Sequence, residues 1–215
     1  MSSDIAPAPR RLTRKGQQTR QRIVDTAAEL IFDRGVAHTT IEDVRAAAEV
    51  SSSQLYHYFD DKLALVRAVI DHQTDTIIAN QEQFDLSSLD GFRAWRDFVV
   101  GYQRSLNCRG GCPIGSLGSE LAETEPQARS AVAQGFRRWE HTISAGLHQM
   151  HARGRLAPEA DPDQLALATL AALQGGLLLA QVQRDTKPLE AALGAMLELI
   201  TTLSVGDSAH GTETR

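Results

Sequence analysis

Apolar residues recur every three or four positions along most of the chain, and no stretch alternates apolar and polar residues between turn signals. The first long example covers about 13–34, where Ile23, Ala27 and Leu30 form one apolar stripe and Gly35 ends the pattern. This spacing places apolar side chains on one face of an α-helix, and a glycine after the last turn is typical of a helix end. The pattern predicts an all-α fold.

Eight further segments carry helical spacing or a helix-start signal, so we expect about nine helices. Two of them are short. The first begins at Thr39, which forms a capping-box pattern with Glu42, and the second covers about 52–59. The next helix begins at Asp60 or Asp61, since either residue is a suitable N-cap. The five helices expected later in the chain cover about 89–107, 113–123, 126–153, 161–184 and 187–204.

Charge is distributed unevenly along the chain. The net charge is −5 over 215 residues, yet residues 1–24 sum to +5, so the remaining 191 residues sum to −10. A basic N-terminal arm before an acidic body is common in proteins with one anion-binding end. No apolar run follows the basic N-terminal residues, and no uninterrupted apolar stretch reaches ~18 residues. We therefore expect a cytoplasmic protein.

The two short helices, with a longer helix on each side, have the pattern of a helix-turn-helix. In that motif the second short helix lies in the major groove of DNA, so its outward side chains must be short or polar. Ser51, Ser52, Ser53, Gln54 and His57 meet this requirement. Serine pairs with donors or acceptors on base edges, and glutamine is suited to a bidentate contact with adenine.

The same segment also contains serine, histidine and aspartate, the residue types of a nucleophilic enzyme or a metal site. It lacks the strand-turn-helix elbow that exposes a catalytic serine in hydrolases. Near His57 the only candidate metal ligands are Asp60 and Asp61, whose position is explained by helix capping. We therefore expect no enzyme, no metal site and no cofactor.

Several short motifs follow one another in a fixed order: FDRG at the end of the first long helix, then TT, VS, and LYHYF with a lysine three residues further on. In this order they resemble the DNA-binding domain of the tetracycline-repressor (TetR) family, over about residues 13–72. DVRAA and SQLYHYF, together with CPIGSLGSELAE, are similar to its LmrA/YxaF-like branch. The resemblance implies a homodimeric transcriptional repressor that binds a pseudo-palindromic operator in double-stranded DNA and is released by a small-molecule effector.

The resemblance also implies roles for single residues. Ser52, Ser53 and Gln54 match the family's base-reading positions. Thr39 or Thr40, at a helix N-terminus, would offer backbone N–H groups to a phosphate. The basic arm would add contacts that release counterions from DNA. The implied phosphate contacts are completed by Tyr56, His57, Lys62, Arg14 and Lys15, and Ser51 adjoins the base-reading group.

Two residues near the turn depart from the family pattern. Glu49 stands where the family has glycine, and a side chain held at positive φ there costs roughly 1 kcal/mol. Arg45 replaces a small residue, and we expect its stem to lie along the helix with the guanidinium in solvent. Neither departure breaks the motif, although both bear on operator contacts.

The C-terminal half is expected to pair two copies of the chain, because a pseudo-palindromic site needs two reading helices. The two most apolar helices, about 161–184 and 187–204, are the predicted dimer contact, where Gly175 and Gly176 would allow close approach. The alternative is that these helices are intrachain core. The predicted domains are a helix-turn-helix domain at 13–62 and a ligand-binding and dimerisation domain at 63–204, between a disordered basic arm at 1–12 and a disordered tail at 205–215.

Aromatic residues are concentrated in two middle helices. In a helical bundle such a cluster lines a ligand cavity or fills the core, and the residues alone leave both interpretations open. The resemblance implies an effector pocket in this half. The sequence does not identify the ligand, and our own hypothesis is an aromatic and mostly apolar small molecule. The alternative is a ligand-independent architectural or site-selection DNA-binding protein with this space filled. The predicted ligand-binding residues are Trp95, Phe98, Tyr102, Phe136 and Trp139.

Cys108 and Cys112 stand four residues apart in the glycine-rich connection NCRGGCPIG. Two thiols make neither a disulfide framework nor, alone, a zinc site. Cys112 precedes Pro113 at a predicted helix N-terminus, where the helix dipole lowers the pKa of a thiol. The pair is a candidate sensor of oxidants or electrophiles. The simpler interpretation is that both are small residues in a tight connection.

Overall fold

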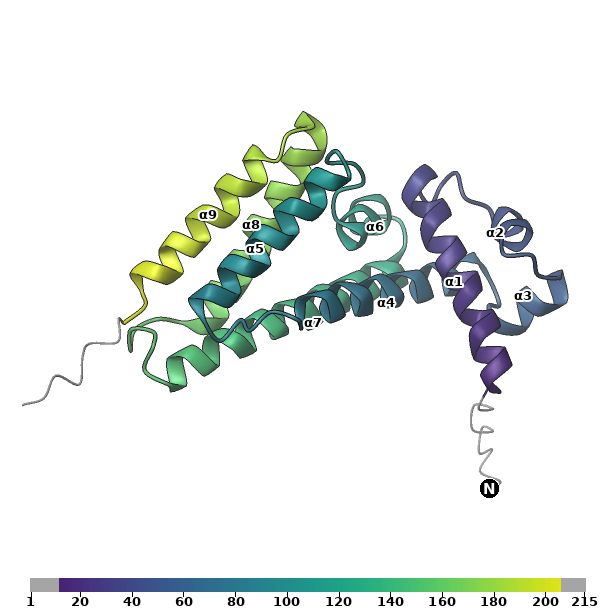
Figure 1. Ribbon diagram of the computed structural model, residues 1–215. Helices are drawn as coiled ribbons and strands as arrows, with labels where there is room; N and C mark the ends of the chain where they lie inside the picture. The colour runs from purple at the N-terminus through teal and green to yellow at the C-terminus, as the bar shows by residue number, and fades with distance from the viewer. Residues whose placement is uncertain (1–11, 206–215) are drawn as a thin grey trace, which may run out of the picture. The chain divides into compact units, whose positions relative to one another are not determined.

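The structure, a computed structural model, describes residues 12–205, and within this range the chain forms nine α-helices (Figure 1). The only β pairing in the range is an isolated bridge between Leu156 and Ser204. The predicted all-α fold is confirmed. Apart from residues 12 and 205, the predicted basic arm and tail lie outside the described range. The helices are α1 (Arg14–Arg34), α2 (Ile41–Ala47), α3 (Ser52–Tyr58), α4 (Lys62–Gln81), α5 (Leu89–Ser105), α6 (Pro113–Leu121), α7 (Pro126–Ala152), α8 (Pro162–Gln183) and α9 (Lys187–Thr202).

The start of α2 differs by one residue from the prediction. Thr40, and not Thr39, is the N-cap: its hydroxyl accepts from the Asp43 N–H at 3.1 Å, and the Asp43 carboxylate accepts from the Thr40 N–H at 2.8 Å. Thr39 is buried, and its hydroxyl donates to the carbonyl oxygen of Gly35 at 2.8 Å. Both threonines have an acid three residues later, so the sequence pattern alone did not separate them.

The chain divides into two compact units, residues 1–69 and 70–215, and the division falls within α4. In the first unit, α1, α2 and α3 pack around a small apolar core. Ile23 from α1, Val44 from α2 and Leu55 from α3 are almost completely buried there, together with Phe59 at the end of α3. These positions follow the helical spacing of the sequence, which is why the three helices could be placed from it.

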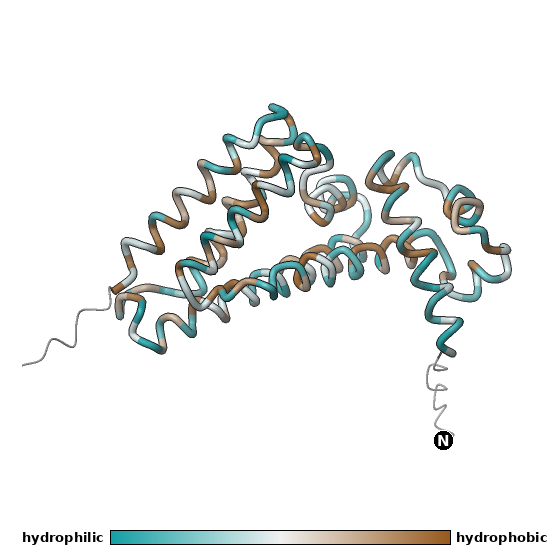
Figure 2. Tube along the Cα trace, viewed as in Figure 1, coloured by the Kyte–Doolittle hydropathy of each residue, from teal (hydrophilic) through white to brown (hydrophobic). Residues whose placement is uncertain are grey.

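The second unit is a helical bundle in which α8 contacts both α7 and α9, and α5 contacts α9 (Figure 1). Hydrophobic positions recur along α8 and α9 (Figure 2). By length and composition alone α8 is apolar enough to cross a membrane, but here its inner face, including Leu165 and Leu173, is buried in the bundle. A Cβ atom at Gly176 would lie 2.9 Å from the Cα of Leu189. The close approach at Gly176 is therefore between α8 and α9 of one chain, whereas a Cβ at Gly175 would meet nothing within 4 Å.

Candidate nucleic-acid interface and ligand cavity

Helix α3 presents an exposed polar face. Its N-cap Ser51 and Gln54 form a reciprocal capping box: the Ser51 N–H donates to Gln54 Oε1 at 2.9 Å, and the Gln54 N–H donates to Ser51 Oγ at 3.1 Å. Leu55 is buried and anchors the helix, whereas Ser52 and Ser53 are exposed. The amide oxygen of Gln54 thus helps to start the helix, and its amide nitrogen is left as a donor on the exposed face.

The turn between α2 and α3 contains a residue with left-handed backbone. Glu49 has a φ of 52°, so the predicted non-glycine residue at positive φ is confirmed. The guanidinium of Arg45 does not stay in solvent as predicted. Its Nε donates to Glu42 Oε1 at 2.8 Å, and its Nη1 donates to the carbonyl oxygen of Val50 at 3.2 Å. The hydrogen bond from Arg45 also holds the pKa of the Glu42 carboxyl below its ordinary value, so the pair stays ionised.

Two further cationic side chains of the first unit donate hydrogen bonds to backbone carbonyl oxygens. Arg22 Nε donates to the carbonyl oxygen of Ala48, at the C-cap of α2, at 3.1 Å. Lys62 Nζ donates to the carbonyl oxygen of Val36, in the loop after α1, at 2.6 Å. Lys62 was expected at a phosphate, and the structure gives its ammonium an internal partner that uses one of its three donors.

The other predicted DNA contacts differ in accessibility. Thr39 is 2% exposed, and its backbone N–H donates to the Val36 carbonyl, so it presents no free donor. At Thr40 the backbone N–H is taken by Asp43, whose pKa is lowered first by the Thr40 hydroxyl and then by this N–H. A carboxylate therefore already occupies the donor that a phosphate would use. The predicted contacts with exposed side chains are Arg14, Lys15, Thr40, Ser51, Ser52, Ser53, Gln54, Tyr56 and His57.

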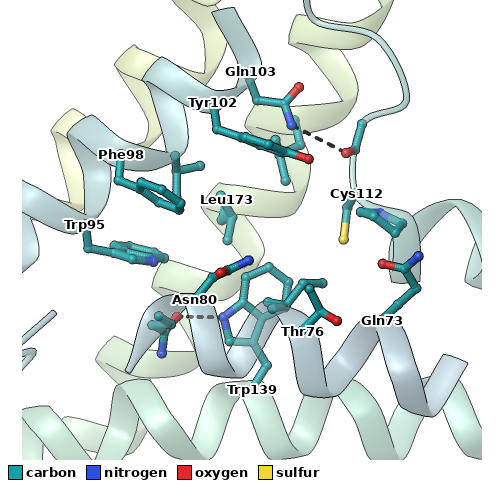
Figure 3. A pocket seen from close by; sticks show the side chains of 16 residues that line it. Gln73, Thr76, Asn80, Trp95, Phe98, Tyr102, Gln103, Cys112, Trp139 and Leu173 are labelled. Atoms are coloured by element: carbon teal, nitrogen blue, oxygen red, sulfur yellow. Dashed lines mark hydrogen bonds between the residues drawn. The ribbon is translucent and has the colours of Figure 1, made fainter. Parts of the chain in front are cut away.

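A cavity of about 150 Å³ lies in the second unit, between α4, α5, α7 and α8 and beside the residues that lead into α6 (Figure 3). Trp95 and Trp139 line it and are only 3% and 5% exposed. Phe98 and Tyr102 line it closer to solvent, at 39% and 55% exposed, with rings nearly parallel and centroids 6.4 Å apart. Four of the five predicted ligand-binding residues are thus brought to one cavity.

The fifth, Phe136, lies elsewhere. It lines an adjoining, more open hollow formed by α6, α7 and α8, which shares Cys112 and Leu177 with the cavity. Phe136 and Trp139 are three residues apart on α7, which turns their side chains about 60° away from each other. Aromatic character grouped the two residues in the prediction, whereas the helix directs them to different surroundings.

Sequence reasoning missed the contribution of α4, which lines the cavity with a largely polar face. Its lining residues recur at helical spacing, which is a signal of one shared face. Most of them carry amides or hydroxyls, so this face did not have the aromatic pattern that was used to predict the pocket. The lining residues of α4 are Gln73, Thr76, Ile77, Asn80 and Gln81.

A buried polar network joins α4 to α7 at the cavity wall. Trp139 Nε1 donates to Gln81 Oε1 at 2.7 Å, Gln81 Nε2 donates to Thr142 Oγ1 at 2.5 Å, and the Thr142 hydroxyl donates to the Trp139 carbonyl at 2.6 Å. Gln81 is 4% exposed, and its amide is paired at both ends. The network fixes the Trp139 indole relative to the last turn of α4, because a buried amide left unpaired is costly.

The two cysteines occupy different surroundings. Cys112 lines the cavity and is the N-cap of α6, where its Sγ accepts from the Gly115 N–H at 3.3 Å. Burial raises the pKa of its thiol and outweighs this hydrogen bond, so the lowered pKa expected from the helix N-terminus is wrong. Cys108 is buried in the preceding loop and lines a different hollow, near Arg104 and Arg184. Across residues 12–205 the structure has no group of three or more His, Cys, Asp or Glu side chains placed to hold a metal ion.

Serine, histidine and aspartate side chains do meet at one place in the second unit. Asp163, near the start of α8, accepts from the Ser144 hydroxyl and lies 3.0 Å from His148 Nε2. In a serine hydrolase the histidine lies between the other two and takes the serine proton. Here the aspartate lies in the middle, so the order differs from that of a hydrolase triad, and the cluster joins α7 to α8.

A helix-turn-helix unit joined to a helical unit with an aromatic cavity is the architecture of a one-component DNA-binding regulator. Models of known protein families match both units. Residues 23–69 match the model of bacterial regulatory proteins of the tetR family, and residues 89–196 match that of the tetracyclin repressor-like C-terminal domain. The chain belongs to the tetR family of transcriptional regulators.

Individual relatives cover most of the chain. The HTH-type transcriptional repressor DhaR of Mycobacterium sp. (strain GP1) is 24% identical over 84% of this chain and 91% of its own length. A TetR transcriptional regulator from Chloroflexus aurantiacus has a solved structure that is 30% identical, with a TM-score of 0.75, covering 89% of this chain and 98% of that one. The reduced form of Escherichia coli NemR is 25% identical, with a TM-score of 0.69, covering 89% and 100%. The assignment to the LmrA/YxaF-like branch stays a prediction.

Proposed function

We propose that the chain is a cytoplasmic repressor that binds a pseudo-palindromic operator as a homodimer and leaves it when a small molecule occupies the cavity. The observation that carries the proposal is the sharing of α4. This helix begins in the DNA-binding unit and contributes five residues to the cavity wall in the second unit. Two relatives, DhaR and NemR, are described as repressors, which supports repression rather than activation of transcription.

Operator recognition would use the exposed face of α3. Ser52 and Ser53 would contact base edges, and the amide nitrogen of Gln54 would donate to an acceptor in the major groove. Tyr56 is 53% exposed and would reach a phosphate with its hydroxyl. Arg14 and Lys15 at the start of α1 would add the salt-dependent part of the affinity.

Dimerisation would use the outer face of α8 and α9. Leu167, Leu178 and Val182 on α8 are 55%, 60% and 73% exposed, and they fall on one helical face together with the open position Gly175. Leu199 on α9 is 43% exposed. Apolar surface of this kind on a regulator favours a symmetric contact in which the same face of each copy meets the other.

Release would work through α4. A ligand in the cavity contacts the last three turns of this helix, whereas Lys62 in its first turn binds the Val36 carbonyl of the DNA-binding unit. The ligand needs only to bind better to the conformation in which the two α3 helices are wrongly spaced for the operator.

The test of DNA reading is a footprint of the purified protein on the DNA around its own gene, repeated with Gln54→Glu. Glutamate keeps the capping box with Ser51, so the helix should form and the melting temperature should stay unchanged. It removes the amide donor and adds a negative charge, so the footprint should disappear. An unchanged footprint would exclude α3 as the reading helix, and Gln127→Glu, on the exposed surface of the second unit, serves as a charge-matched control.

Ligand screening by thermal shift separates this proposal from a ligand-independent architectural protein. A released repressor is stabilised by some compound that also dissociates it from DNA, whereas an architectural protein shows no compound with both effects.

A thiol-based response is the second candidate, because Cys112 lines the same cavity. The solved structure of Escherichia coli NemR is of the reduced form of that protein. Treating wild type and Cys112→Ser with an alkylating agent tests the candidate: release that persists in the variant would exclude this sulfur.

A further inference from the structure

The wall of the cavity between α4, α5, α7 and α8 is electrically neutral. Among the described residues that line it, none is Asp, Glu, Lys, Arg or His. An ionised group that enters such a space loses its hydration without gaining an opposite charge, which strongly disfavours binding. A ligand that fits this wall is therefore uncharged.

The inner part of the cavity is aromatic. Trp95 from α5 and Trp139 from α7 approach it from two sides, with Leu173 of α8 behind them (Figure 3). The nearly parallel rings of Phe98 and Tyr102 continue this surface toward solvent. Aromatic faces and edges favour a flat partner. The cavity, at about 150 Å³, is similar in size to an engineered cavity of ~150 Å³ that takes up benzene.

Among the polar side chains that line the cavity, Asn80 lies next to the tryptophans. Figure 3 shows the side-chain amide of Asn80 between Trp95 and Trp139. Among residues 12–205 the structure gives that amide no hydrogen-bond partner, although the backbone carbonyl of Asn80 accepts from Gln83 at 2.6 Å. The neighbouring amide of Gln81, in contrast, is paired at both ends. Asn80, which is exposed, therefore has free hydrogen-bonding capacity on this wall, and so does the buried Oε1 of Gln103, to which the structure gives no partner among the described residues.

We propose that the cavity binds an uncharged aromatic molecule of about one ring that carries a hydrogen-bonding group, and that Asn80 pairs with this group. The ring displaces water from the two tryptophans, and a hydroxyl or carbonyl on the ring bonds to the amide. The proposal rests on the proposed function only in taking this cavity as the effector site.

The chain provides its own reporter of occupancy, because its two tryptophans both line the cavity. Intrinsic tryptophan fluorescence of the full-length protein is titrated with para-cresol, para-xylene, para-toluate, para-methylbenzylammonium and the saturated alcohol corresponding to para-cresol. Para-cresol should bind roughly tenfold or more tighter than the carboxylate or the ammonium, because only the ions lose hydration without compensation. The saturated alcohol should bind several-fold more weakly, since it is not flat.

Three variants locate the polar contact. Asn80→Leu should lower the affinity for para-cresol to that for para-xylene, and para-xylene itself should bind as before, which also shows that the cavity is intact. Asn80→Asp places a negative charge at the same point and should make para-methylbenzylammonium bind more tightly than para-cresol. Gln134→Leu changes an exposed amide of α7 outside the cavity, with no hydrogen bond to Asn80, and should alter neither affinity.

The ligand class is overturned if a charged probe binds wild type more tightly than para-cresol, if no probe binds, or if Asn80→Leu leaves the affinity for para-cresol unchanged. Operator footprinting in the presence of para-cresol keeps the proposed function separate. Binding in the predicted order without any change in the footprint would support the ligand class and contradict release from DNA by that ligand.

Discussion

Arg45 crosses the turn of the helix-turn-helix and donates to the carbonyl oxygen of Val50, 3.2 Å from its Nη1. Val50 directly follows Glu49, the residue with left-handed backbone, and the other side of the same guanidinium is held by Glu42. A side chain of α2 thus fixes the carbonyl next to the strained residue, and the angle at which α3 leaves the turn depends on this contact.

Replacing Arg45 by alanine should weaken operator binding several-fold and lower the melting temperature, because the turn loses the hydrogen bonds that the guanidinium makes to Glu42 and to the Val50 carbonyl. It should leave the slope of log affinity against log salt unchanged, since Arg45 acts on the backbone and not on a phosphate. Lys15→Ala is the matched comparison and should make that slope shallower by roughly one. A shallower slope in Arg45→Ala would show that the arginine contacts DNA directly.

Glu49→Gly should stabilise the protein by about 0.5–1 kcal/mol, because glycine adopts the φ of 52° without the cost that a Cβ imposes. Ala46→Gly, three residues earlier and inside α2, should destabilise it by about 1 kcal/mol. Denaturant unfolding of both variants measures the difference. Equal effects of the two substitutions would mean that backbone strain at Glu49 is negligible.

Trp139→Phe should destabilise the second unit by about 1–3 kcal/mol, because phenylalanine leaves Gln81 Oε1 buried without its donor. Phe98→Leu, on the more exposed side of the cavity, breaks no hydrogen bond and should cost less. Thermal unfolding compares them. If both variants melt alike, the network between α4 and α7 contributes little.

Leu178→Arg should convert the proposed dimer to monomer, since it places an unpaired charge in the proposed contact face, where the side chain is 60% exposed in a single chain. Sedimentation velocity measures the mass, and Ala152→Arg at the exposed end of α7 controls for added charge. A dimer that survives Leu178→Arg would move the contact away from this face of α8.

Stability should fall at alkaline pH partly because of Cys112. Its pKa in the folded state is raised above the ordinary value of 9.0, chiefly by burial. The stability that the protonated thiol contributes is therefore present below the ordinary pKa and lost as pH rises through the folded-state pKa. In Cys112→Ser the decline of stability above pH 9 should be shallower than in wild type. Parallel curves would assign the alkaline loss to other groups.

The positions of the helices and the character of their faces could be predicted from the sequence. Helical spacing and capping residues located all nine helices within a few residues in the described range, because these signals act between neighbours in the chain. The exposed polar face of α3 and the buried Leu55 followed from the same spacing. The left-handed position at Glu49 was recognisable only through the family resemblance, because the family has glycine there.

Only the tertiary structure decided which side chains meet. Adjacent threonines compete for one cap, and the packing of the loop buried Thr39 and left Thr40 as the N-cap. Phe136 and Trp139 share a helix but face different hollows, and the amides of α4 join the aromatic residues at a cavity that no local pattern shows. For Cys112, burial by distant helices outweighs the helix N-terminus on which it sits. Neighbours in sequence determine the helices, whereas surroundings built from distant segments determine exposure, charge state and the composition of the cavity.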